Sequence, residues 1–555
     1  MPTMKRSSCT ILWTLVYLFS SIYPSSEAVL SSRDDLLTCL SNVQNLNTVS
    51  PSSSSYDTDR LSFNRRFDYR PAAIAYTTSV EQVQAAVKCG ASSGTAVVAR
   101  SGGHSYAAYG LGGQNGTLVI DLSGMTALSL NNGTGEATAQ TGLKLGQLAQ
   151  GIWDQGRRAL PHGTCPYIGI GGHTAYGGMG LFSRQAGLLS DRAVRAEVVL
   201  ANGTLVTAAF DQNQDLYWAL RGAGPSFGIV TAWTYATLPA PDNIGYEIEY
   251  SPAAGGKDGF INAFNSFQNF ARNAPSTLGM ALAIVPNGAN QLVFSLSGNF
   301  YGSLADFNTT IQPLLAQIPE GRLTSKQFNW IESLADVAGS LSTSSPEPVD
   351  NFYAKSLMTK DLVSNSSIAS FVDYMYSQGT ADNLGLDWFV EVDVYGGEIA
   401  RASSDVSSYF NRDAFLSFQF YASAKPLTAP YPASGITFLD GMHDSVQVDS
   451  QAAYPNYIDP GLSATQWQTQ YYGSNYERLS TIKNAVDPQN VFRFPQSVGS
   501  NSAASNPPGS PDTNTSTPKP SASSSPSTSG GLQSVGCPSV QAVLLVLLTF
   551  FVCNF

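Results

Sequence analysis

The sequence predicts an α+β protein with two folded parts and a tail at each end. Over about 65–240, short apolar runs of strand length alternate with helical patterns and are joined by glycine-rich turns. Beyond Pro239, longer runs rich in aromatic and β-branched residues, such as 387–395, predict a second part with an antiparallel sheet. A chain of 555 residues is longer than one typical domain, so it has room for two or three.

Charge and composition exclude several classes of protein. Lys and Arg total 29 and Asp and Glu total 40, which gives a net charge of −11. Because the chain has no block of basic residues, it is not expected to bind nucleic acid by neutralising phosphates. Charged residues make up only 12 % and glycine occurs 50 times, a composition that disfavours helical bundles and coiled coils.

Residues 1–28 have the pattern of a secretory signal peptide. Lys5 and Arg6 precede an apolar run over 9–19, and small residues then lead to Ala28, where we expect cleavage. The apolar run is too short to span a bilayer, which disfavours the alternative of a membrane anchor.

The C-terminal end predicts attachment at the cell surface. Residues 499–531 are rich in Ser, Thr and Pro and cannot bury enough apolar surface to fold, so we expect a stalk. Residues 532–555 end in an apolar tail without basic stop-transfer residues, as in a glycosylphosphatidylinositol (GPI) anchor signal. Ser529 and Gly530 are candidate attachment sites. We therefore expect a monomeric extracellular protein that is held to the membrane through this anchor alone.

Three of the six cysteines fall in the segments that are expected to be removed. The mature protein keeps Cys39, Cys89 and Cys165, an odd number for an oxidising compartment. Cys39 and Cys89 can pair, which leaves Cys165 to be explained. Five Asn-X-Ser/Thr sequons that precede the stalk suit a glycosylated surface. Their asparagines are Asn115, Asn132, Asn202, Asn308 and Asn365.

The first part opens with a helix predicted over 78–90. Thr78 and Glu81 would form a capping box at its start, and Gly90 would end it. The further elements expected are strands over 95–100 and 117–122, a helix in which Leu145, Leu148 and Ile152 form one stripe, and strands over 194–200 and 204–208 joined in a hairpin at Asn202-Gly203.

In the second part, the strand 387–395 carries two carboxylates on one face. Alternation places Phe389, Glu391, Asp393 and Tyr395 together, opposite a face of Trp and Val. A merely solvent-exposed face would show the same pattern, so that alternative stays open. A second strand is expected over 416–422, and the final segment 452–497 is aromatic-rich and ends in a helix over 476–486.

Two glycine-rich loops carry three of the four histidines. The first is Arg100-Ser-Gly-Gly-His-Ser-Tyr106, and the second runs from Pro161 to Gly180 with seven glycines around Cys165. Glycines let backbone N–H groups face an anion such as a pyrophosphate. Neither loop has the spacing of a nicotinamide-binding fold, which argues against a plain Rossmann dehydrogenase.

Three interpretations of these loops compete. His104, His162, Cys165 and His173 could bind a metal, although their spacing matches no zinc pattern. The glycines could form a tight structural turn with hydrogen-bonded histidines. Alternatively, the loops cradle a phosphate-bearing cofactor, with His104 and Cys165 attached to it.

The paired signature of Gly-Gly-His-Ser-Tyr and, about sixty residues later, Gly-Thr-Cys resembles the flavin-binding segments of the vanillyl-alcohol-oxidase superfamily. Within it, the chain resembles the berberine-bridge-enzyme-like branch, which includes fungal glucooligosaccharide and chitooligosaccharide oxidases. The resemblance implies a two-part FAD-binding domain, formed by 65–240 and a returning segment 452–497. Residues 241–451 would form an α+β substrate domain with an antiparallel sheet.

The same resemblance implies one FAD with two covalent bonds, from His104 to the 8α-methyl and from Cys165 to C6. It also implies the Cys39–Cys89 disulfide. No metal is expected. The other residues expected to bind FAD are Arg100, Ser101, Gly102, Gly103, Ser105, Pro161, Gly163, Thr164, Gly171, Gly172, His173, Gly177, Gly178 and Asn456.

The segment Tyr454-Pro-Asn-Tyr457 resembles the Tyr-x-Asn-Tyr motif of the sugar oxidases, which implies that Tyr457 is the catalytic base. A tyrosine has a reference pKa of about 10 and needs a partner to accept a proton near neutral pH. Asp393 is the expected partner and Glu391, on the same face, is its rival. Tyr106 matches the family's active-site tyrosine.

The implied reaction oxidises the C1 hydroxyl of a reducing-end oligosaccharide to a lactone, with dioxygen as acceptor and hydrogen peroxide as product. Relatives that react well with dioxygen commonly carry valine three residues after the linked cysteine, where this chain has Ile168. A sugar dehydrogenase with another acceptor is therefore an alternative. An oxidase of alkaloids or other secondary-metabolite alcohols and a non-catalytic wall protein are further alternatives.

Overall fold

The computed structural model describes residues 35–251, 256–287, 291–345, 348–380, 384–403, 405–427, 430–449 and 452–499. The predicted signal peptide, the hydrophobic tail and all but the first residue of the predicted stalk lie outside the described residues. Within the described ranges, none of the helices combines the length and the apolar character needed to cross a membrane.

Two small sheets form the part of the chain that ends at Pro239. The first has the order β1-β2-β4-β3, with β4 parallel to both β2 and β3 and with β1 antiparallel to β2. The second is antiparallel, with the order β5-β6-β10-β8-β9, and the short strands β7 and β11 pair separately. The strands are β1 Asn47–Val49, β2 Ala73–Tyr76, β3 Val97–Arg100, β4 Leu118–Asp121, β5 Leu128–Asn131, β6 Glu136–Gln140, β7 Arg158–Ala159, β8 Ala193–Val199, β9 Leu205–Ala209, β10 Ile229–Ala236 and β11 Leu238–Pro239.

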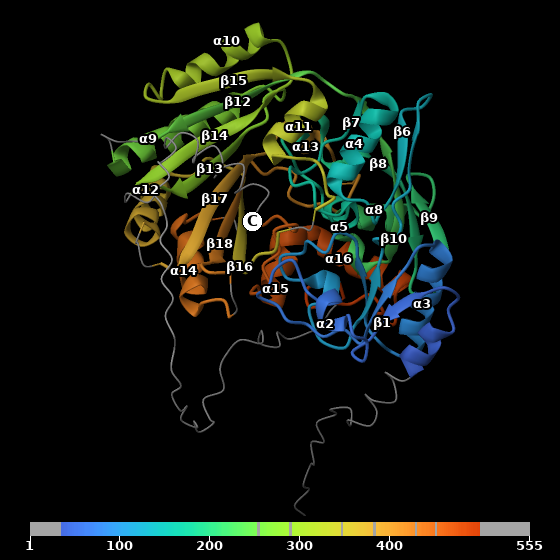
Figure 1. Ribbon diagram of the computed structural model, residues 1–555. Coiled ribbons are helices and arrows are strands. Elements are labelled where there is room, and N and C mark those ends of the chain that lie inside the picture. Colours follow the sequence, from blue (N-terminus) through green and yellow to red (C-terminus); the bar gives the residue numbers. More distant parts are fainter. Residues whose placement is uncertain are drawn as a thin grey trace, which may run out of the picture.

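Helices connect and cover these strands (Figure 1). They are α2 Tyr56–Asp59, α3 Val80–Ser92, α4 Leu145–Gly156, α5 Ile170–Ala175, α6 Ser183–Ala186, α7 Leu189–Arg192 and α8 Gln214–Ala223, with the 3₁₀ turns η1 Tyr109–Leu111 and η2 Gly224–Ser226. The predicted hairpin at Asn202-Gly203 is confirmed by β8 and β9.

The predicted start and end of the first helix are wrong. Its cap is Ser79, whose hydroxyl accepts the N–H of Gln82, whereas Thr78 donates its hydroxyl to the Gln82 side chain. The capping box therefore does not form between Thr78 and Glu81. Gly90 lies inside α3, and the need for glycine there comes from packing against Val97, where an added Cβ would lie 2.3 Å from a side-chain carbon.

Residues after Pro239 form a seven-stranded antiparallel sheet with the order β15-β12-β14-β13-β17-β18-β16. Its strands are β12 Asn243–Tyr250, β13 Ala281–Pro286, β14 Leu292–Phe300, β15 Arg322–Phe328, β16 Phe352–Thr359, β17 Leu386–Val394 and β18 Leu416–Ala424. The accompanying helices are α9 Gly256–Asn273, α10 Leu304–Leu315, α11 Trp330–Ala338, α12 Asn365–Tyr374, the π turn η3 Met375–Gly379, α13 Glu398–Arg401 and α14 Ala433–Ser445.

Strand β17 has two different faces, as its alternation predicts. Trp388, Val390 and Val392 share a core with α9, α12 and α14, which lie on one side of the sheet (Figure 1). Phe389 belongs to the opposite face and packs with Phe63 of the first part. The alternative of a solvent-exposed carboxylate face is wrong, since Asp393 is only 6 % exposed.

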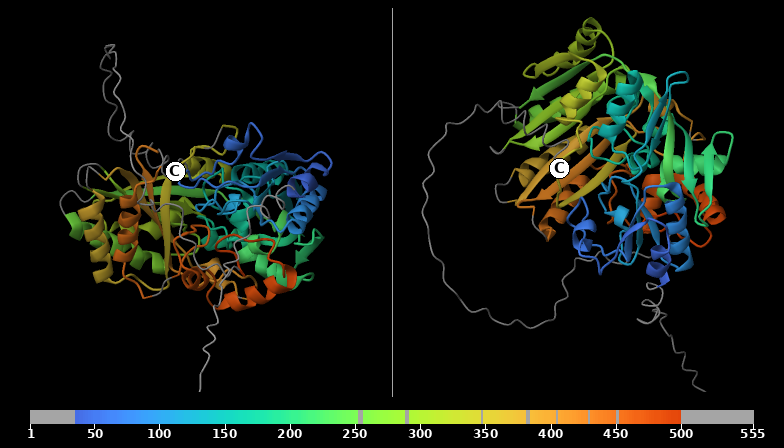
Figure 2. Two further views of the ribbon diagram at one scale, coloured as in Figure 1. Left: turned by 90° about the horizontal axis from the view of Figure 1, so that it is seen from below. Right: turned by 45° about the vertical axis from the view of Figure 1, so that its right-hand side comes forward.

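The last segment returns to the first part of the chain, and Figure 2 shows the two lying together from other sides. It contains α15 Ala464–Trp467, the π turn η4 Gln468–Tyr472, η5 Gly473–Asn475 and α16 Tyr476–Val486, which confirms the predicted helix. The buried Lys483 pairs with Asp487 and donates to the carbonyl of Ser226 at 2.7 Å, which ties α16 to η2.

The predicted disulfide is confirmed. Cys39 and Cys89 are bonded, with Cα atoms 5.6 Å apart, and join the N-terminal described segment to α3.

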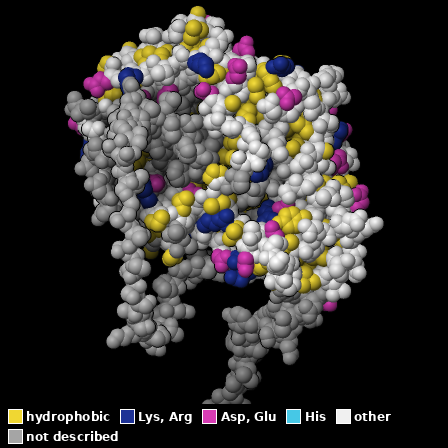
Figure 3. Space-filling view, in the orientation of Figure 1, with side chains coloured by type: hydrophobic (Ala, Val, Ile, Leu, Met, Phe, Trp, Pro, Cys, Tyr) yellow, Lys and Arg dark blue, Asp and Glu magenta, His cyan; other side chains and the backbone are white. Residues whose placement is uncertain are grey.

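On the face shown in Figure 3, Lys and Arg side chains are interspersed with Asp and Glu side chains. The residue ranges predicted for the domains remain predictions.

Candidate active site

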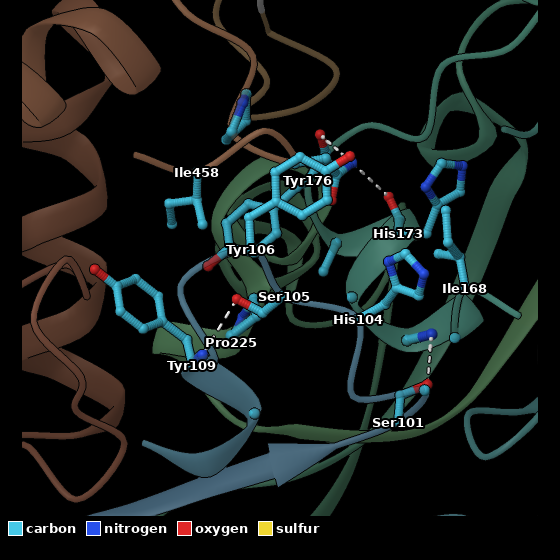
Figure 4. Close-up of a pocket in the computed structure, with 18 of the residues that line it drawn as sticks. Ser101, His104, Ser105, Tyr106, Tyr109, Ile168, His173, Tyr176, Pro225 and Ile458 are labelled. Carbon is cyan, nitrogen blue, oxygen red and sulfur yellow. Dashed lines mark hydrogen bonds between the residues drawn. The ribbon is translucent and has the colours of Figure 1, made fainter. Parts of the chain in front are cut away.

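A cavity of about 250 Å³ lies where the two glycine loops, the seven-stranded sheet and the returning C-terminal segment meet. Figure 4 shows His104, Ile168 and His173 on one side of it and the rings of Tyr106 and Tyr176 nearby. Most of the residues singled out in the sequence line this cavity. They are Arg100, Ser101, Gly102, Gly103, His104, Ser105, Tyr106, Gly163, Thr164, Cys165, Gly171, Gly172, His173, Asn456 and Tyr457.

The two glycine loops touch through their backbones. A Cβ added to Gly102 would lie 2.3 Å from the nitrogen of Gly169, and one added to Gly169 would lie 2.0 Å from the nitrogen of Gly102. Only glycine permits so close an approach. The hydroxyl of Ser101 also accepts the N–H of Gly171 at 3.3 Å. These contacts bring His104 and Cys165 to one cavity although 60 residues separate them.

His104 and Cys165 occupy different surroundings. The imidazole of His104 stacks on the ring of Phe63, with centroids 3.9 Å apart. Cys165 is the described cysteine that the disulfide does not use, and it is buried at 7 % exposure. Both side chains belong to residues that line the cavity.

The other two loop histidines support the backbone of the second loop. His173 accepts the N–H of Gly163 on Nε2 at 2.9 Å, and His162 Nδ1 lies 2.7 Å from the carbonyl oxygen of Gly163. Burial lowers the pKa of both, and that of His173 falls to about 3. Among the described residues, His, Cys, Asp and Glu form no cluster suited to a metal ion.

The motif Tyr454-Pro-Asn-Tyr457 is held against the second loop. The Tyr454 hydroxyl accepts the N–H of Gly178 at 3.2 Å and of Met179 at 2.9 Å, as well as the side-chain amide of Asn456 at 2.8 Å. This cluster presents Tyr457 to the cavity. Its ring stacks on that of Tyr106 at an interplanar angle of 9° and a centroid distance of 5.8 Å.

Behind Tyr457 lies a pair of carboxyl groups. The Tyr457 hydroxyl donates to Asp393, and Asp393 shares a hydrogen bond with Glu391. Burial raises the pKa of Asp393 well above its usual range, and the charge of Glu391 raises it further. Burial also raises the pKa of Tyr457, to which both carboxylates contribute. Tyr457 thus needs an acceptor for its own proton if it is to act as a base near neutral pH.

Tyr106 is fixed from the sheet. Gln419 on β18 donates its side-chain amide to the Tyr106 hydroxyl at 2.6 Å. Burial and the charge of Glu391 raise the pKa of Tyr106 far above its usual value. Tyr106 is therefore neutral throughout the physiological pH range.

Four predicted site residues lie beside the cavity rather than in its lining: Pro161, Gly177, Gly178 and Asp393. Gly178 donates to Tyr454, and Asp393 is hydrogen-bonded to Tyr457, which lines the cavity. The guanidinium of Arg100 is ion-paired with Asp121 and donates to the Asp59 carbonyl oxygen at 2.8 Å. Arg100 therefore braces the first loop with most of its hydrogen-bonding capacity.

The sequence reasoning missed several lining residues. Gly224, Pro225 and Gly228 line the cavity from a third glycine-rich stretch, 222–228. That composition was a usable signal. Gln419 gave no such signal, because only the pairing of β17 with β18 brings it next to Glu391.

The lining suits an elongated cofactor with a pyrophosphate. A Cβ added to Gly172 would meet nothing within 4 Å, so the backbone of this loop opens directly onto free space. Three glycine-rich stretches line the cavity, where their N–H groups can face an anion. A nucleophilic thiol and an imidazole lie in the same lining. These features fit FAD held by two side-chain bonds.

Comparison with known proteins agrees with this geometry. Residues 71–209 match the family model "FAD binding domain", and residues 453–499 match "Berberine and berberine like". The chain is 34 % identical to a chitooligosaccharide oxidase of Gibberella zeae, over 87 % of this chain and 98 % of that protein. It is 36 % identical to a xylooligosaccharide oxidase of Thermothelomyces thermophilus, over 83 % and 93 %.

The fold also matches a solved structure of the glucooligosaccharide oxidase from Acremonium strictum. The TM-score is 0.78 at 33 % identity, covering 84 % of this chain and 99 % of that one. The description of that structure names a 6-S-cysteinyl, 8α-N1-histidyl FAD.

Proposed function

Since the chain belongs to the berberine-bridge-enzyme-like FAD-linked oxidases, we propose that it oxidises the C1 hydroxyl of reducing-end oligosaccharides to the lactone. It is an FAD-dependent oxidoreductase acting on CH–OH groups, with a fold of the vanillyl-alcohol-oxidase type. The observation that carries the proposal is the placement of Tyr457, which lines the cavity and whose hydroxyl is hydrogen-bonded to Asp393.

His104 and Cys165 would hold FAD covalently, and the glycine loops would hold its pyrophosphate. When bound, FAD would accept the two electrons that leave the alcohol, so the cofactor and not the protein would supply the redox chemistry. Residues 65–240 and 452–497 would form the FAD-binding domain and 241–451 the substrate domain. The position of Cys165 and His104 in one lining supports this assignment.

The protein's own groups position the alcohol and move its proton. Tyr457 would take the proton of the C1 hydroxyl while its own proton passes to Asp393. Tyr106, neutral and fixed by Gln419, would donate a hydrogen bond to the sugar or hold the ring of Tyr457 in place by stacking. The aromatic rings around the cavity, including Phe389, suit stacking against a sugar ring.

We propose dioxygen as the electron acceptor, with hydrogen peroxide as product. Ile168 lines the cavity, so its side chain is placed to control the access of dioxygen. The specific alternative is a sugar dehydrogenase that uses another acceptor. Isoleucine at position 168 favours this alternative, because it is larger than the valine of relatives that react well with dioxygen.

We further propose that the protein is secreted, glycosylated and GPI-anchored, as the terminal segments indicate. The five sequon asparagines that the structure describes are exposed, which suits glycan attachment: Asn115, Asn132, Asn202, Asn308 and Asn365.

Anaerobic bleaching of the flavin tests the substrate class. Cello-, chito-, xylo- and malto-oligosaccharides are mixed with the purified protein beside a set of alkaloids. At least one oligosaccharide series is expected to bleach the flavin. The rate of bleaching is expected to fall by at least about 100-fold in Tyr457→Phe. Bleaching by alkaloids and by no carbohydrate would overturn the proposal.

A further inference from the structure

Two carboxyl groups lie one after the other on the same face of β17, inside the protein. Asp393 is 6 % exposed, while Glu391 is half-buried and lines the cavity. The residues opposite them on the neighbouring strands are uncharged. Asp393 faces Ala281 and Ser417, and Glu391 faces Ala283 and Gln419.

The titratable groups that face this pair are tyrosines. Tyr457 and Tyr454 come from the returning segment, Tyr106 from the first glycine loop and Tyr395 from the residue after β17; each has a pKa raised by burial and by one or both of these carboxylates. Cys165 lies beyond them and acts on Tyr106. No cation is among the interactions that set the pKa of Glu391 or Asp393 in the described part of the chain.

Two buried carboxylates joined by a hydrogen bond do not both ionise near neutral pH. Burial raises the pKa of Glu391 to about 7, and the charge of Glu391 holds the pKa of Asp393 above its own buried value. The pair therefore keeps at least one proton over the neutral range, takes up a second as the pH falls through about 7, and titrates as a unit.

The proton held by the carboxyl pair limits how Tyr457 can act as a base. The pKa of Tyr457 is raised well above 10, so Tyr457 must give up its proton as it gains one from the alcohol. Its hydrogen-bond partner Asp393 already holds the shared proton. Asp393 can accept another only if it passes its own on, and Glu391 is the group bonded to it that can take it.

Resting on the proposed function, we propose that Glu391 is the final acceptor of the substrate's proton, which reaches it through Tyr457 and Asp393. The O–H bond of the C1 hydroxyl breaks and its proton goes to the Tyr457 oxygen. The Tyr457 proton goes to Asp393, and the Asp393 proton goes to Glu391, which changes from carboxylate to acid. The electron pair leaves with the C1 hydrogen to the FAD of the proposed function. Glu391 then releases the proton into the cavity that it lines.

The pH dependence of flavin reduction tests this relay. Once Glu391 is protonated it can accept nothing, so the wild-type rate at limiting sugar falls about tenfold from its plateau when the pH is one unit below 7. In Glu391→Gln the relay must end on Asp393, whose pKa is then set without the Glu391 charge. The acid limb of this variant is expected to lie at least half a pH unit away from that of the wild type.

Glu247→Gln is the matched control, because Glu247 lies in the same sheet on β12 and accepts a hydrogen bond from the Ser295 hydroxyl at 2.9 Å. Its acid limb is expected to coincide with the wild-type one. An acid limb unchanged in Glu391→Gln would overturn the relay, even if the KM for sugar rises, because a residue that only binds sugar changes KM without moving this limb. Glu391→Asp, which keeps the carboxylate, is expected to restore an acid limb that Gln moves.

Failure of the proposed function looks different, since no sugar would then reduce the wild-type flavin at any pH. In that case infrared spectroscopy of the resting protein decides whether Glu391 exchanges the shared proton. A protonated-carboxyl band that titrates near pH 7 in the wild type and is lost in Glu391→Gln supports the pair. A band with the same titration in both proteins would overturn it.

Discussion

The ring of Phe63 stacks on the imidazole of His104, with centroids 3.9 Å apart and planes inclined by 22°. Phe63 comes from the segment between α2 and β2 and also packs edge-on against Phe352 of the sheet, at 5.7 Å. The imidazole plane is thereby fixed from a part of the chain that lies far from the glycine loops in sequence. Phe63 is a positioning residue for the proposed attachment of FAD.

Phe63→Ala is expected to lower the fraction of protein whose His104 carries flavin, because the imidazole loses the ring that orients it. Removing a buried phenylalanine also costs about 3 kcal/mol of stability. Mass spectrometry of the His104 peptide measures the first effect and thermal unfolding the second. Phe210→Ala is the matched control, since Phe210 is 77 % exposed, and it should change neither. Complete histidyl linkage in Phe63→Ala would contradict the positioning role.

Tyr454→Phe is expected to destabilise the protein by about 2–4 kcal/mol. The change leaves the N–H groups of Gly178 and Met179 without their acceptor, and an unpaired buried donor costs about 1–3 kcal/mol. Urea unfolding measures the loss. Tyr167→Phe is the control, because its hydroxyl makes only an exposed 3.4 Å bond to Ser345, and it should cost less than about 0.5 kcal/mol. Equal stability of the two variants would show that Tyr454 does not hold the second loop.

Acid should destabilise the fold through His173. Its pKa is lowered to about 3 by burial, and the unfolded value is near 6.5. Below pH 6.5 the unfolded chain therefore binds a proton at His173 that the folded protein does not bind. The stability supplied by neutral His173 is complete above pH 6.5 and falls as the pH decreases below that value.

His173→Gln removes this titration while keeping an acceptor for the Gly163 N–H. Between pH 7 and pH 5 the wild type should lose about 2 kcal/mol more stability than the variant, at 1.36 kcal/mol per pH unit below 6.5. Urea unfolding at both pH values measures the difference. The same loss in both proteins would mean that His173 does not stay neutral in the fold.

Ile168→Val is expected to speed the reaction of the reduced flavin with dioxygen several-fold, since the side chain that lines the cavity becomes one methylene smaller. Stopped-flow mixing of reduced protein with air-saturated buffer gives the rate. Ile170→Val makes the same change at a fully buried core position outside the lining and should leave the rate unaltered. An unchanged rate in Ile168→Val would remove Ile168 from the control of dioxygen.

Local features could be predicted from the sequence because their causes are local. The helix over 476–486 was predicted from its own pattern, and the hairpin at Asn202-Gly203 from its turn, where Gly203 has a φ of +77°. The predicted cap of α3 was wrong by one residue, because Thr78 and Ser79 are both suitable caps. In the structure Ser79 is the cap, because its hydroxyl accepts the Gln82 N–H.

The residues of the candidate site also differ in whether the sequence alone could predict them. His104, Cys165 and Tyr457 could be proposed from the sequence because the loops and the motif that carry them resemble those of a known family. Phe63 and Gln419 could not, since one reaches His104 through tertiary packing and the other reaches Tyr106 through the register of β18. The proposed joint action of Asp393 and Glu391 also depends on burial, which alternation along β17 does not specify.

Mass spectrometry of the digested, purified protein tests the proposed attachment of FAD. The peptide with His104 and the peptide with Cys165 are expected to be recovered joined through a single FAD. Recovery of both peptides with an unmodified imidazole and an unmodified thiol would contradict it.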